Sequence, residues 1–313
     1  MGLLACIPRG REEFLSALRP LVDEDVEVHA GSWVACDVLV EGRPDREHFA
    51  PPPRAVVVPY AGVPAETAAL LRDFPGVTLH NLHHNAAPTA ETALALLLAA
   101  AKRVVPFDRA LRAGDWRPRY ETPGEALLDG GTALVLGYGA VGRRVAAACR
   151  ALGMDVVAVR RREGSEGDVH GLAALHDLLP RAAAVVSCLP LTEDTRGLLG
   201  ARELALLPDG AVLVNVGRAA VVDEDALFAE LESGRIAAGL DVWYRYPEDE
   251  DARAATAPSR HPFGRLPNVV LSPHHAGSCR GIEQLRARHL ADLLNAAARG
   301  APIPNRVEPE RGY

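Results

Sequence analysis

Hydrophobic residues recur along the chain in short runs that alternate with longer amphipathic stretches. In the first hundred residues, runs rich in Val, Leu and Ile predict strands at 3–7, 26–29, 38–40, 55–58 and 77–80. Amphipathic segments at 11–18 and 65–73 lie between these runs and predict helices. Such alternation is typical of a small α/β unit with a largely parallel sheet.

A second and more regular alternation begins at Thr132. Apolar runs predict strands at 133–136, 155–159, 183–187, 211–216, 236–241 and 269–272, and helical segments of crossover length separate them. This pattern predicts a doubly wound parallel sheet. A last helix is predicted at 279–298, and we expect it to return to the first unit.

The stretch between the two patterns carries the expected domain boundary. A long apolar helix is predicted from Thr89 to about Val105, Pro106 is expected to interrupt it, and Gly114 to Trp116 is the expected hinge. We therefore predict a dinucleotide-binding domain at 101–279. A discontinuous, flavodoxin-like α/β substrate domain is predicted at 1–100 and 280–313.

The first strand of the regular pattern leads into a glycine-rich turn. Residues 137–142 have the G-x-G-x-x-G spacing and consist of Gly137, Tyr138, Gly139, Ala140, Val141 and Gly142. The first glycine permits a sharp turn, the second leaves room for a pyrophosphate, and the third lets the following helix pack closely. A chance glycine turn is the alternative in an Ala- and Gly-rich chain. The position between a strand and a helix favours a Rossmann dinucleotide site, with phosphates at the helix N-terminus.

The residues after the second strand bear on the choice of dinucleotide. An acidic residue here would bind the ribose hydroxyls of NAD, whereas arginine accommodates the 2′-phosphate of NADP. The chain has Arg160, Arg161 and Arg162, and the first acidic residue is Glu163. Guanidinium groups bind phosphate bidentately. We therefore predict a preference for NADP(H), with NAD possible; solvated surface arginines are the alternative interpretation.

Composition narrows the class of protein. The 313 residues are 48% hydrophobic and 24% charged, and their net charge of -7 gives no reason to expect nucleic acid or acidic lipid as a partner. The longest apolar run, 93–101, is too short to span a bilayer, and no secretory signal is visible. Five scattered cysteines are interpreted as buried thiols in a reducing compartment, so a cytoplasmic location is expected. The histidines at 80, 83 and 84 are interpreted as loop residues without metal-ligand spacing, and no metal is predicted.

Three polar residues follow predicted strands of the second unit. Arg218 comes after the fourth strand, Asp241 ends the fifth, and His274 follows the sixth. Ligands of open α/β sheets bind outside the carboxyl ends of the strands. All three side chains are therefore candidates for one site.

Four motifs in order, G-x-G-x-x-G, N-x-x-R-x-x-x-V-D, G-L-D-V and S-P-H, resemble the D-isomer-specific 2-hydroxyacid dehydrogenases. The resemblance covers nearly the whole chain. Within the family, the chain resembles the glyoxylate/hydroxypyruvate reductase-like members. It implies an oxidoreductase that uses NAD(P)H to reduce a 2-keto acid to a D-2-hydroxy acid. A homodimer formed through the helix at 89–105 is a further family-level expectation.

The resemblance also implies roles for individual residues. Arg218 would hold the substrate carboxylate and polarise the keto oxygen, His274 would act as general acid/base, and Asp241 would lie near the nicotinamide. Ala61 and Gly62 would bind the carboxylate through backbone N–H groups, and Asn85 is a weaker substrate-binding candidate. The cofactor cleft would be lined by Cys188, Leu189, Pro190, Thr195, Val216 and Gly217.

One position departs from the family pattern. Where the family places a glutamate that partners the catalytic histidine, this chain has Tyr246, which offers no negative charge at neutral pH. Tyr246 is therefore an uncertain member of the catalytic set, and Glu248 or Asp249 could supply the charge. A formate dehydrogenase-like enzyme is one alternative, because formate oxidation needs no proton transfer. A non-catalytic, nucleotide-sensing corepressor is another.

Overall fold

The computed structural model describes residues 2–121, 125–161 and 168–310, and the chain divides into two compact units. Unit 1 consists of the residues up to Asn85 and those from Ser278 onward, and unit 2 runs from Ala86 to Gly277. The chain therefore passes between the units at these positions, and the segment around Pro106 and Gly114 lies within unit 2. Helix α3 (Ala86–Ala101) also falls in unit 2, whereas the sequence-based boundary assigned most of it to the first domain.

Unit 1 contains a mostly parallel sheet with helices on both faces. Its elements are β1 (Leu3–Ile7), α1 (Glu12–Leu18), β2 (Val26–Ala30), β3 (Val38–Val40), β4 (Ala55–Val58), α2 (Ala65–Arg72), β5 (Thr78–Asn81), α10 (Ile282–Ala298) and β13 (Arg306–Val307). The strand order is β13-β5-β4-β3-β1-β2, and β13 is antiparallel to β5. Without β13, this is the flavodoxin-like order that the sequence predicted.

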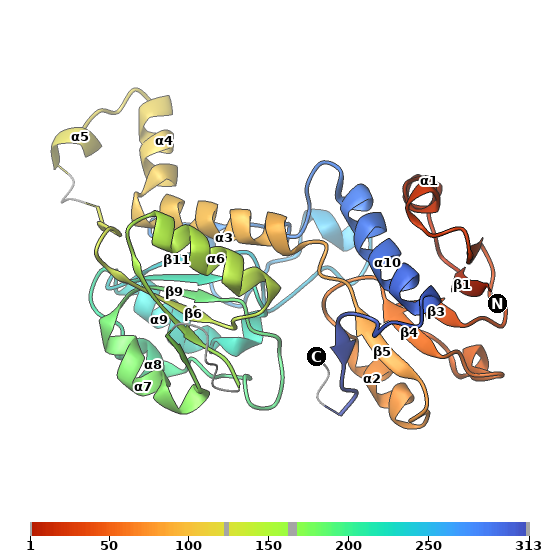
Figure 1. Cartoon of the computed structure of the whole chain (residues 1–313). Helices are drawn as coiled ribbons and strands as arrows, with labels where there is room; N and C mark the ends of the chain where they lie inside the picture. The colour runs from red at the N-terminus through yellow and green to blue at the C-terminus, as the bar shows by residue number, and fades with distance from the viewer. Residues whose placement is uncertain (1, 122–124, 162–167, 311–313) are drawn as a thin grey trace. The chain divides into compact units, whose positions relative to one another are not determined.

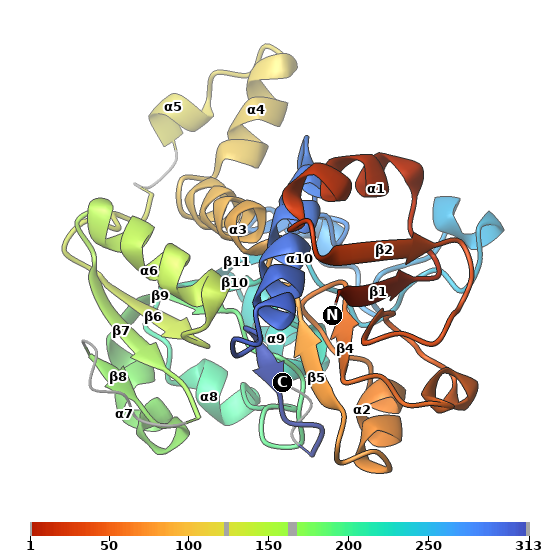
Figure 2. The ribbon, with the colours of Figure 1, turned by 45° about the vertical axis from the view of Figure 1, so that its right-hand side comes forward.

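Alternate residues of the unit 1 strands enter two separate cores. Ala5, Val38 and Val57 face α1 and α10, whereas Cys6 and Val56 face the side covered by α2. Figure 2 shows α1 and α10 along one face of this sheet. Because both faces are covered, the inner strands β1, β3 and β4 are continuous apolar runs rather than alternating ones. This explains why sequence inspection located them.

Unit 2 is a doubly wound parallel sheet. Its elements are α3, α4 (Val104–Arg112), α5 (Pro118–Glu121), β6 (Thr132–Leu136), α6 (Ala140–Ala151), β7 (Asp155–Val159), β8 (Val169–His170), α7 (Leu175–Leu178), β9 (Ala182–Ser187), α8 (Ala201–Ala205), β10 (Val212–Asn215), α9 (Glu224–Glu232), β11 (Ala237–Leu240) and β12 (Val269–Leu271). The strand order is β12-β11-β10-β9-β6-β7-β8. This is the Rossmann order, extended by one strand. The short strand β8 was not predicted.

Helices cover both faces of the unit 2 sheet. Figure 1 shows α3 and α6 on one side and α7, α8 and α9 on the other, and each side has its own apolar core. Gly239 in β11 allows α3 to approach closely, because a Cβ there would lie 2.7 Å from the Cβ of Leu96. Helix α3 is thus an integral layer of unit 2.

Local expectations fail at three places. The break after α3 falls at Arg103, which has a left-handed φ of 51°, whereas Pro106 lies in the first turn of α4, where a missing N–H is tolerated. His80 lies in strand β5, as the strand predicted at 77–80 implied, and its interpretation as a loop residue was wrong. Cys279 is exposed because it precedes α10 in a surface turn, so not all five cysteines are buried. No helix among the described residues is long and apolar enough to cross a membrane.

Candidate active site

The glycine turn between β6 and α6 has the geometry that its sequence predicted. Gly137 has a φ of 93°, which glycine adopts without strain. A Cβ at Gly142 would lie 1.9 Å from the carbonyl oxygen of Gly137, so only glycine permits the close packing of helix on strand. Gly139 is the N-cap of α6, and a Cβ there would meet no atom within 4 Å. Open space therefore lies at the start of the helix, where a phosphate can reach backbone N–H groups.

The loops after β9 and β10 pack against this turn. A Cβ at Gly217 would lie 2.5 Å from the carbonyl oxygen of Leu189, and one at Gly137 would lie 3.1 Å from that of Cys188. Thr195 fixes the first of these loops, because its hydroxyl donates to the carbonyl of Pro190 at 2.7 Å. The predicted cofactor residues of these two loops, Cys188, Leu189, Pro190, Thr195, Val216 and Gly217, are thus assembled next to the glycine turn.

Arg160 directly follows β7 and lies next to the glycine turn. The N–H of Gly137 donates to the carbonyl of Val159 at 2.8 Å, and the N–H of Arg160 donates to that of His170 at 3.0 Å. Arg161 follows and is exposed. Both arginines therefore lie at the end of β7, next to the glycine turn. The third arginine of the prediction, at 162, lies outside the described residues.

Arg218 is positioned by Asn215 at the end of β10. The side chain of Asn215 accepts a hydrogen bond from the N–H of Gly217 and donates to the carbonyl of Arg218, both at 3.1 Å. The guanidinium of Arg218 is exposed and donates to the carbonyl of Gly217 at 2.8 Å. Asn215 was part of the recognised motif but had been assigned no role. The sequence feature that could have indicated a role for Asn215 is its position at the end of a strand.

Asp241 directly follows β11, and its buried carboxylate binds the turn that follows β12. Its residue is only 1% exposed, and its carboxylate accepts hydrogen bonds from the backbone N–H of His275 at 2.9 Å and of Ala276 at 3.1 Å. The hydroxyl of Ser272 also donates to it. Ser272 is a second residue whose contribution the motif did not indicate. Asp241 therefore fixes the backbone on both sides of His274.

His274 lies on this turn with a left-handed φ of 57° and is exposed to solvent. The pKa of His274 is lowered from its ordinary value. Partial burial is the main cause, and the positive charge of Arg218 adds to the effect, whereas the negative charge of Asp241 opposes it. Arg218 and Asp241 are thus both close enough to His274 to shift its pKa. The sequence predicted this grouping at the ends of β10, β11 and β12, which are neighbours in the sheet.

Tyr246 contacts the imidazole through its ring. The ring centroids of Tyr246 and His274 lie 5.4 Å apart at an angle of 52°, and the phenol oxygen accepts the N–H of Trp243 at 3.0 Å. The contact between Tyr246 and His274 is therefore one between rings, because the phenol oxygen is engaged by Trp243. Burial raises the pKa of Tyr246, so its phenol is neutral at physiological pH. Asp249 uses its carboxylate to accept the N–H of Ala252 at 2.8 Å, at the start of a short helical turn.

The three candidate substrate-binding residues of unit 1 follow two adjacent parallel strands. Ala61 and Gly62 come after β4, and Asn85 comes after β5. The carbonyl of Ala61 accepts a hydrogen bond from the side chain of Asn81 at 2.6 Å. The turn after β4 is therefore connected to the end of β5 within unit 1.

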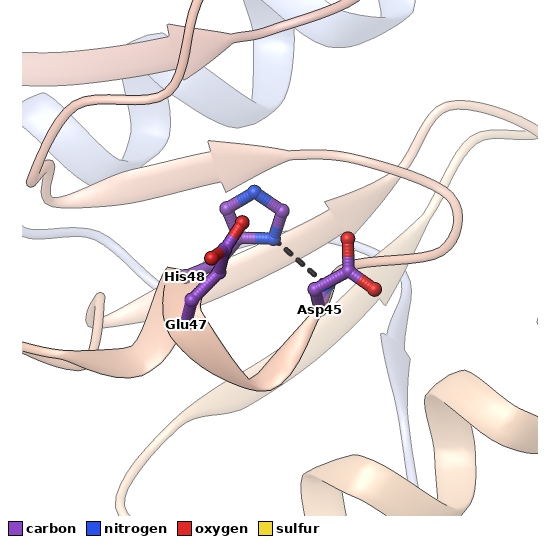
Figure 3. A group of neighbouring side chains, drawn as sticks. All are labelled: Asp45, Glu47 and His48. Carbon is purple, nitrogen blue, oxygen red and sulfur yellow. Dashed lines mark hydrogen bonds between the residues drawn. The ribbon is translucent and has the colours of Figure 1, made fainter.

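Asp45, Glu47 and His48 form a further cluster of potential metal ligands in unit 1 (Figure 3). Nδ1 of His48 accepts the backbone N–H of Asp45 at 2.8 Å, which closes the first turn of the short helix Arg46–Phe49. The two acidic residues are exposed. Local helix capping accounts for this arrangement, and we assign no metal to it.

Fold and site together define a two-unit α/β protein with a Rossmann unit whose strand ends carry an arginine, an aspartate and a histidine. Residues 94–276 match the family described as D-isomer specific 2-hydroxyacid dehydrogenase, NAD binding domain. The chain belongs to this family. The matched segment lies within unit 2.

Individual relatives agree with this membership. The chain is 38% identical over 232 residues to a glyoxylate reductase of Aeropyrum pernix. The match covers 71% of this chain and 66%, just under two thirds, of that protein. The chain is 30% identical over 311 residues to a glycerate dehydrogenase of Methylorubrum extorquens, covering 94% and 91% of the two chains. Among solved structures, a D-isomer specific 2-hydroxyacid dehydrogenase from Xanthobacter autotrophicus Py2, in complex with NADPH and MES, is similar with a TM-score of 0.79. It is 30% identical, and the match covers 100% of this chain and 99% of that one.

Proposed function

We propose that the protein catalyses the reversible, NAD(P)H-dependent reduction of a 2-keto acid to a D-2-hydroxy acid. The observation that carries this proposal is the grouping of Arg218, Asp241 and His274 at adjacent strand ends, where the first two lie close enough to His274 to shift its pKa. The names of the relatives make glyoxylate and hydroxypyruvate the first substrates to test.

The unit 2 residues fit a dinucleotide. The open space at Gly139, the N-terminus of α6 and the packed loops around Cys188 and Gly217 provide room and backbone donors for a pyrophosphate. When bound, the nicotinamide supplies the hydride for C2 of the substrate. The arginines at the end of β7 would bind a 2′-phosphate, so we propose that NADP(H) is preferred over NAD(H). A kcat/KM with NADH that equals or exceeds the value with NADPH would contradict this preference.

The side chains at the strand ends have complementary roles in this proposal. Arg218 binds the substrate carboxylate and polarises the keto oxygen. His274 in its protonated form gives a proton to that oxygen, and its exposure allows reprotonation from water. Asp241 is buried and acts through the turn that carries His274, as well as through its charge. Tyr246 packs against the imidazole and limits its rotation.

Ala61, Gly62 and Asn85 of unit 1 keep the substrate-binding roles that the family resemblance implies. The N–H groups of Ala61 and Gly62 bind the carboxylate, and Asn85 lies on the turn after the neighbouring strand. A small molecule is therefore the expected partner, and the expected homodimer stays a prediction.

The test is a panel of NADPH with glyoxylate, hydroxypyruvate or phenylpyruvate. Turnover of at least one acid is expected, and it should be lost in His274→Ala and Arg218→Ala. The variant His275→Ala is the matched control, because that residue contributes only its backbone N–H to Asp241. Failure to reduce any 2-keto acid would remove the main proposal.

Formate oxidation is a second candidate, favoured by the neutral Tyr246 beside His274. Hydride transfer from formate releases CO2 and requires no proton from the imidazole. Formate with NADP+ therefore belongs in the same panel. Activity with formate that survives in His274→Gln, without turnover of any keto acid, would favour this candidate.

A further inference from the structure

The turn after β4 is held from one side by the end of β5. The carbonyl of Tyr60 accepts the N–H of Leu82 at 3.4 Å, and the carbonyl of Ala61 accepts Nδ2 of Asn81 at 2.6 Å. In a trans peptide, the N–H points away from the carbonyl of the same peptide unit. The N–H groups of Ala61 and Gly62 therefore face away from β5, and within the described part of the chain neither donates a hydrogen bond.

Asn81 destabilises the folded state at its position, and the hydrogen bond from its amide to the turn is the contribution that can explain its presence. It is only 4% exposed, and its Oδ1 is buried without a hydrogen-bond partner among the described residues. A buried acceptor without a partner destabilises the folded state, and an apolar side chain would avoid that loss. The contribution that an apolar side chain could not make is the hydrogen bond from Nδ2 to Ala61.

The C-terminal segment holds Asn81 from the other side. The N–H of Asn81 donates to the carbonyl of Asn305 at 3.3 Å, and Nδ2 of Asn305 donates to the carbonyl of Asn81 at 3.1 Å. Asn305 has a left-handed φ of 56°, and β13 then pairs with β5. Nδ1 of His80 and the carbonyl of Pro304 make a further contact of 2.8 Å. The end of β5 is therefore fixed on both edges.

We propose that Asn81 is the positioning residue of the substrate turn. By binding the carbonyl of Ala61, it orients the N–H of Gly62 for the carboxylate of the substrate, and Asn305 keeps Asn81 in place. The N–H of Ala61 is oriented alongside it by the hydrogen bond from Leu82 to the carbonyl of Tyr60. The inference rests on the proposed function of Ala61 and Gly62 as carboxylate-binding groups. It also gives the C-terminal segment 304–307 a part in substrate binding.

The variant Asn81→Asp tests this role because it is isosteric and its ionised form cannot donate to Ala61. With glyoxylate and NADPH, we expect KM to rise about tenfold or more at alkaline pH, with an unchanged Kd for NADPH. As the pH falls, the buried carboxyl becomes protonated and can donate again, so the ratio of variant to wild-type KM should fall towards one. Asn305→Gly keeps the left-handed backbone but removes one clamp, and we expect a smaller rise of about threefold.

Asn295→Asp is the matched control. The side chain of Asn295 donates to the carbonyl of Leu21 at 3.0 Å and accepts the N–H of Asp23 at 2.9 Å, also in unit 1 but away from the substrate turn. This variant should lose stability and keep the wild-type KM. A folded Asn81→Asp protein with wild-type KM at every pH would overturn the inference, as would an equal rise of KM in Asn295→Asp.

Amide NMR separates this inference from the proposed activity. In the wild type, titration with oxalate should shift the amide resonances of Ala61 and Gly62. Asn81→Asp should abolish the shift of Gly62 at alkaline pH, because the carbonyl that Asn81 binds belongs to the same peptide unit as that N–H. If the wild type reduces no 2-keto acid but shows this pattern, the proposed function fails and the role of Asn81 stands. If the two wild-type amides do not respond to oxalate, the role of Asn81 is wrong, whatever the activity.

Discussion

Substitution of Tyr246 by Glu would give His274 an anionic neighbour in place of a neutral one. In the wild type, burial and Arg218 lower the pKa of His274 despite Asp241. The protonated form is the one that reduction needs, so kcat/KM for a keto acid should fall as the pH rises through a value below 6.5, the ordinary pKa. The reverse oxidation needs the neutral imidazole and should persist above that pH.

The size of the change follows from the geometry. The two rings are 5.4 Å apart, and unit charges at about this distance attract by about 3 kcal/mol at an effective dielectric constant of about 20, but by only about 0.8 kcal/mol in bulk water. Tyr246 is 46% exposed, so screening places the expected value between these limits, at about 1.5 kcal/mol. This corresponds to a rise of about one unit in the pKa of His274.

The assay is the pH dependence of kcat/KM for glyoxylate with NADPH. In Tyr246→Glu, the descending limb should move about one unit towards alkaline pH. Tyr246→Phe is the control, because it keeps the ring beside His274 and removes only the oxygen that accepts the N–H of Trp243. If the limb of the Glu variant coincides with that of the wild type, while His274→Ala remains inactive, our account of the electrostatics of His274 is incorrect.

Four further variants address the scaffold and a dimer interface. Gly142→Ala should lower the free energy of unfolding by about 1–3 kcal/mol in urea titrations because of the close approach to Gly137, whereas Gly139→Ala should keep stability and weaken NADPH binding in a fluorescence titration. Asp241→Asn should cost about 3 kcal/mol in the same urea assay, since the amide cannot accept all the N–H and O–H donors of the turn, and unchanged stability would contradict this role. No residue of α4 is buried, and Leu111 and Trp116 line a hollow of about 340 Å³. Leu111→Glu combined with Trp116→Glu should therefore yield a monomer in light scattering if a dimer forms through this surface rather than through the helix predicted at 89–105. A wild type that is already monomeric would remove the dimer prediction.

The sequence was sufficient for the strands of three or more residues and for the motifs at their ends, whereas the two-residue strands β8 and β13 were not predicted. Strands buried on both faces are continuous apolar runs, and the carboxyl ends of neighbouring parallel strands meet at one edge, so Arg218, Asp241 and His274 could be grouped in advance. The glycine spacing likewise specified a turn with little alternative geometry. These features depend on local sequence and on general rules of α/β folds.

Other features depend on contacts that no local pattern records. The left-handed Arg103 that ends α3 has no glycine or asparagine to mark it, and strand β8 has only two residues. The hydrogen bond from Asn81 to Ala61 joins residues twenty positions apart. The phenol oxygen of Tyr246 is engaged by the backbone of Trp243, which leaves the ring to contact His274. Such arrangements are decided by tertiary packing.

The left-handed backbone of His274 carries an evolutionary consequence. An L-residue in this conformation is less stable than glycine by about 1 kcal/mol, and the position is held by the hydrogen bonds that Asp241 makes to the next two residues. Selection for thermal resistance alone would therefore favour glycine or asparagine at this site. An imidazole kept there against the backbone preference is a local exchange of stability for function, and a search for stabilising substitutions would be drawn to a position that the proposed chemistry cannot lose.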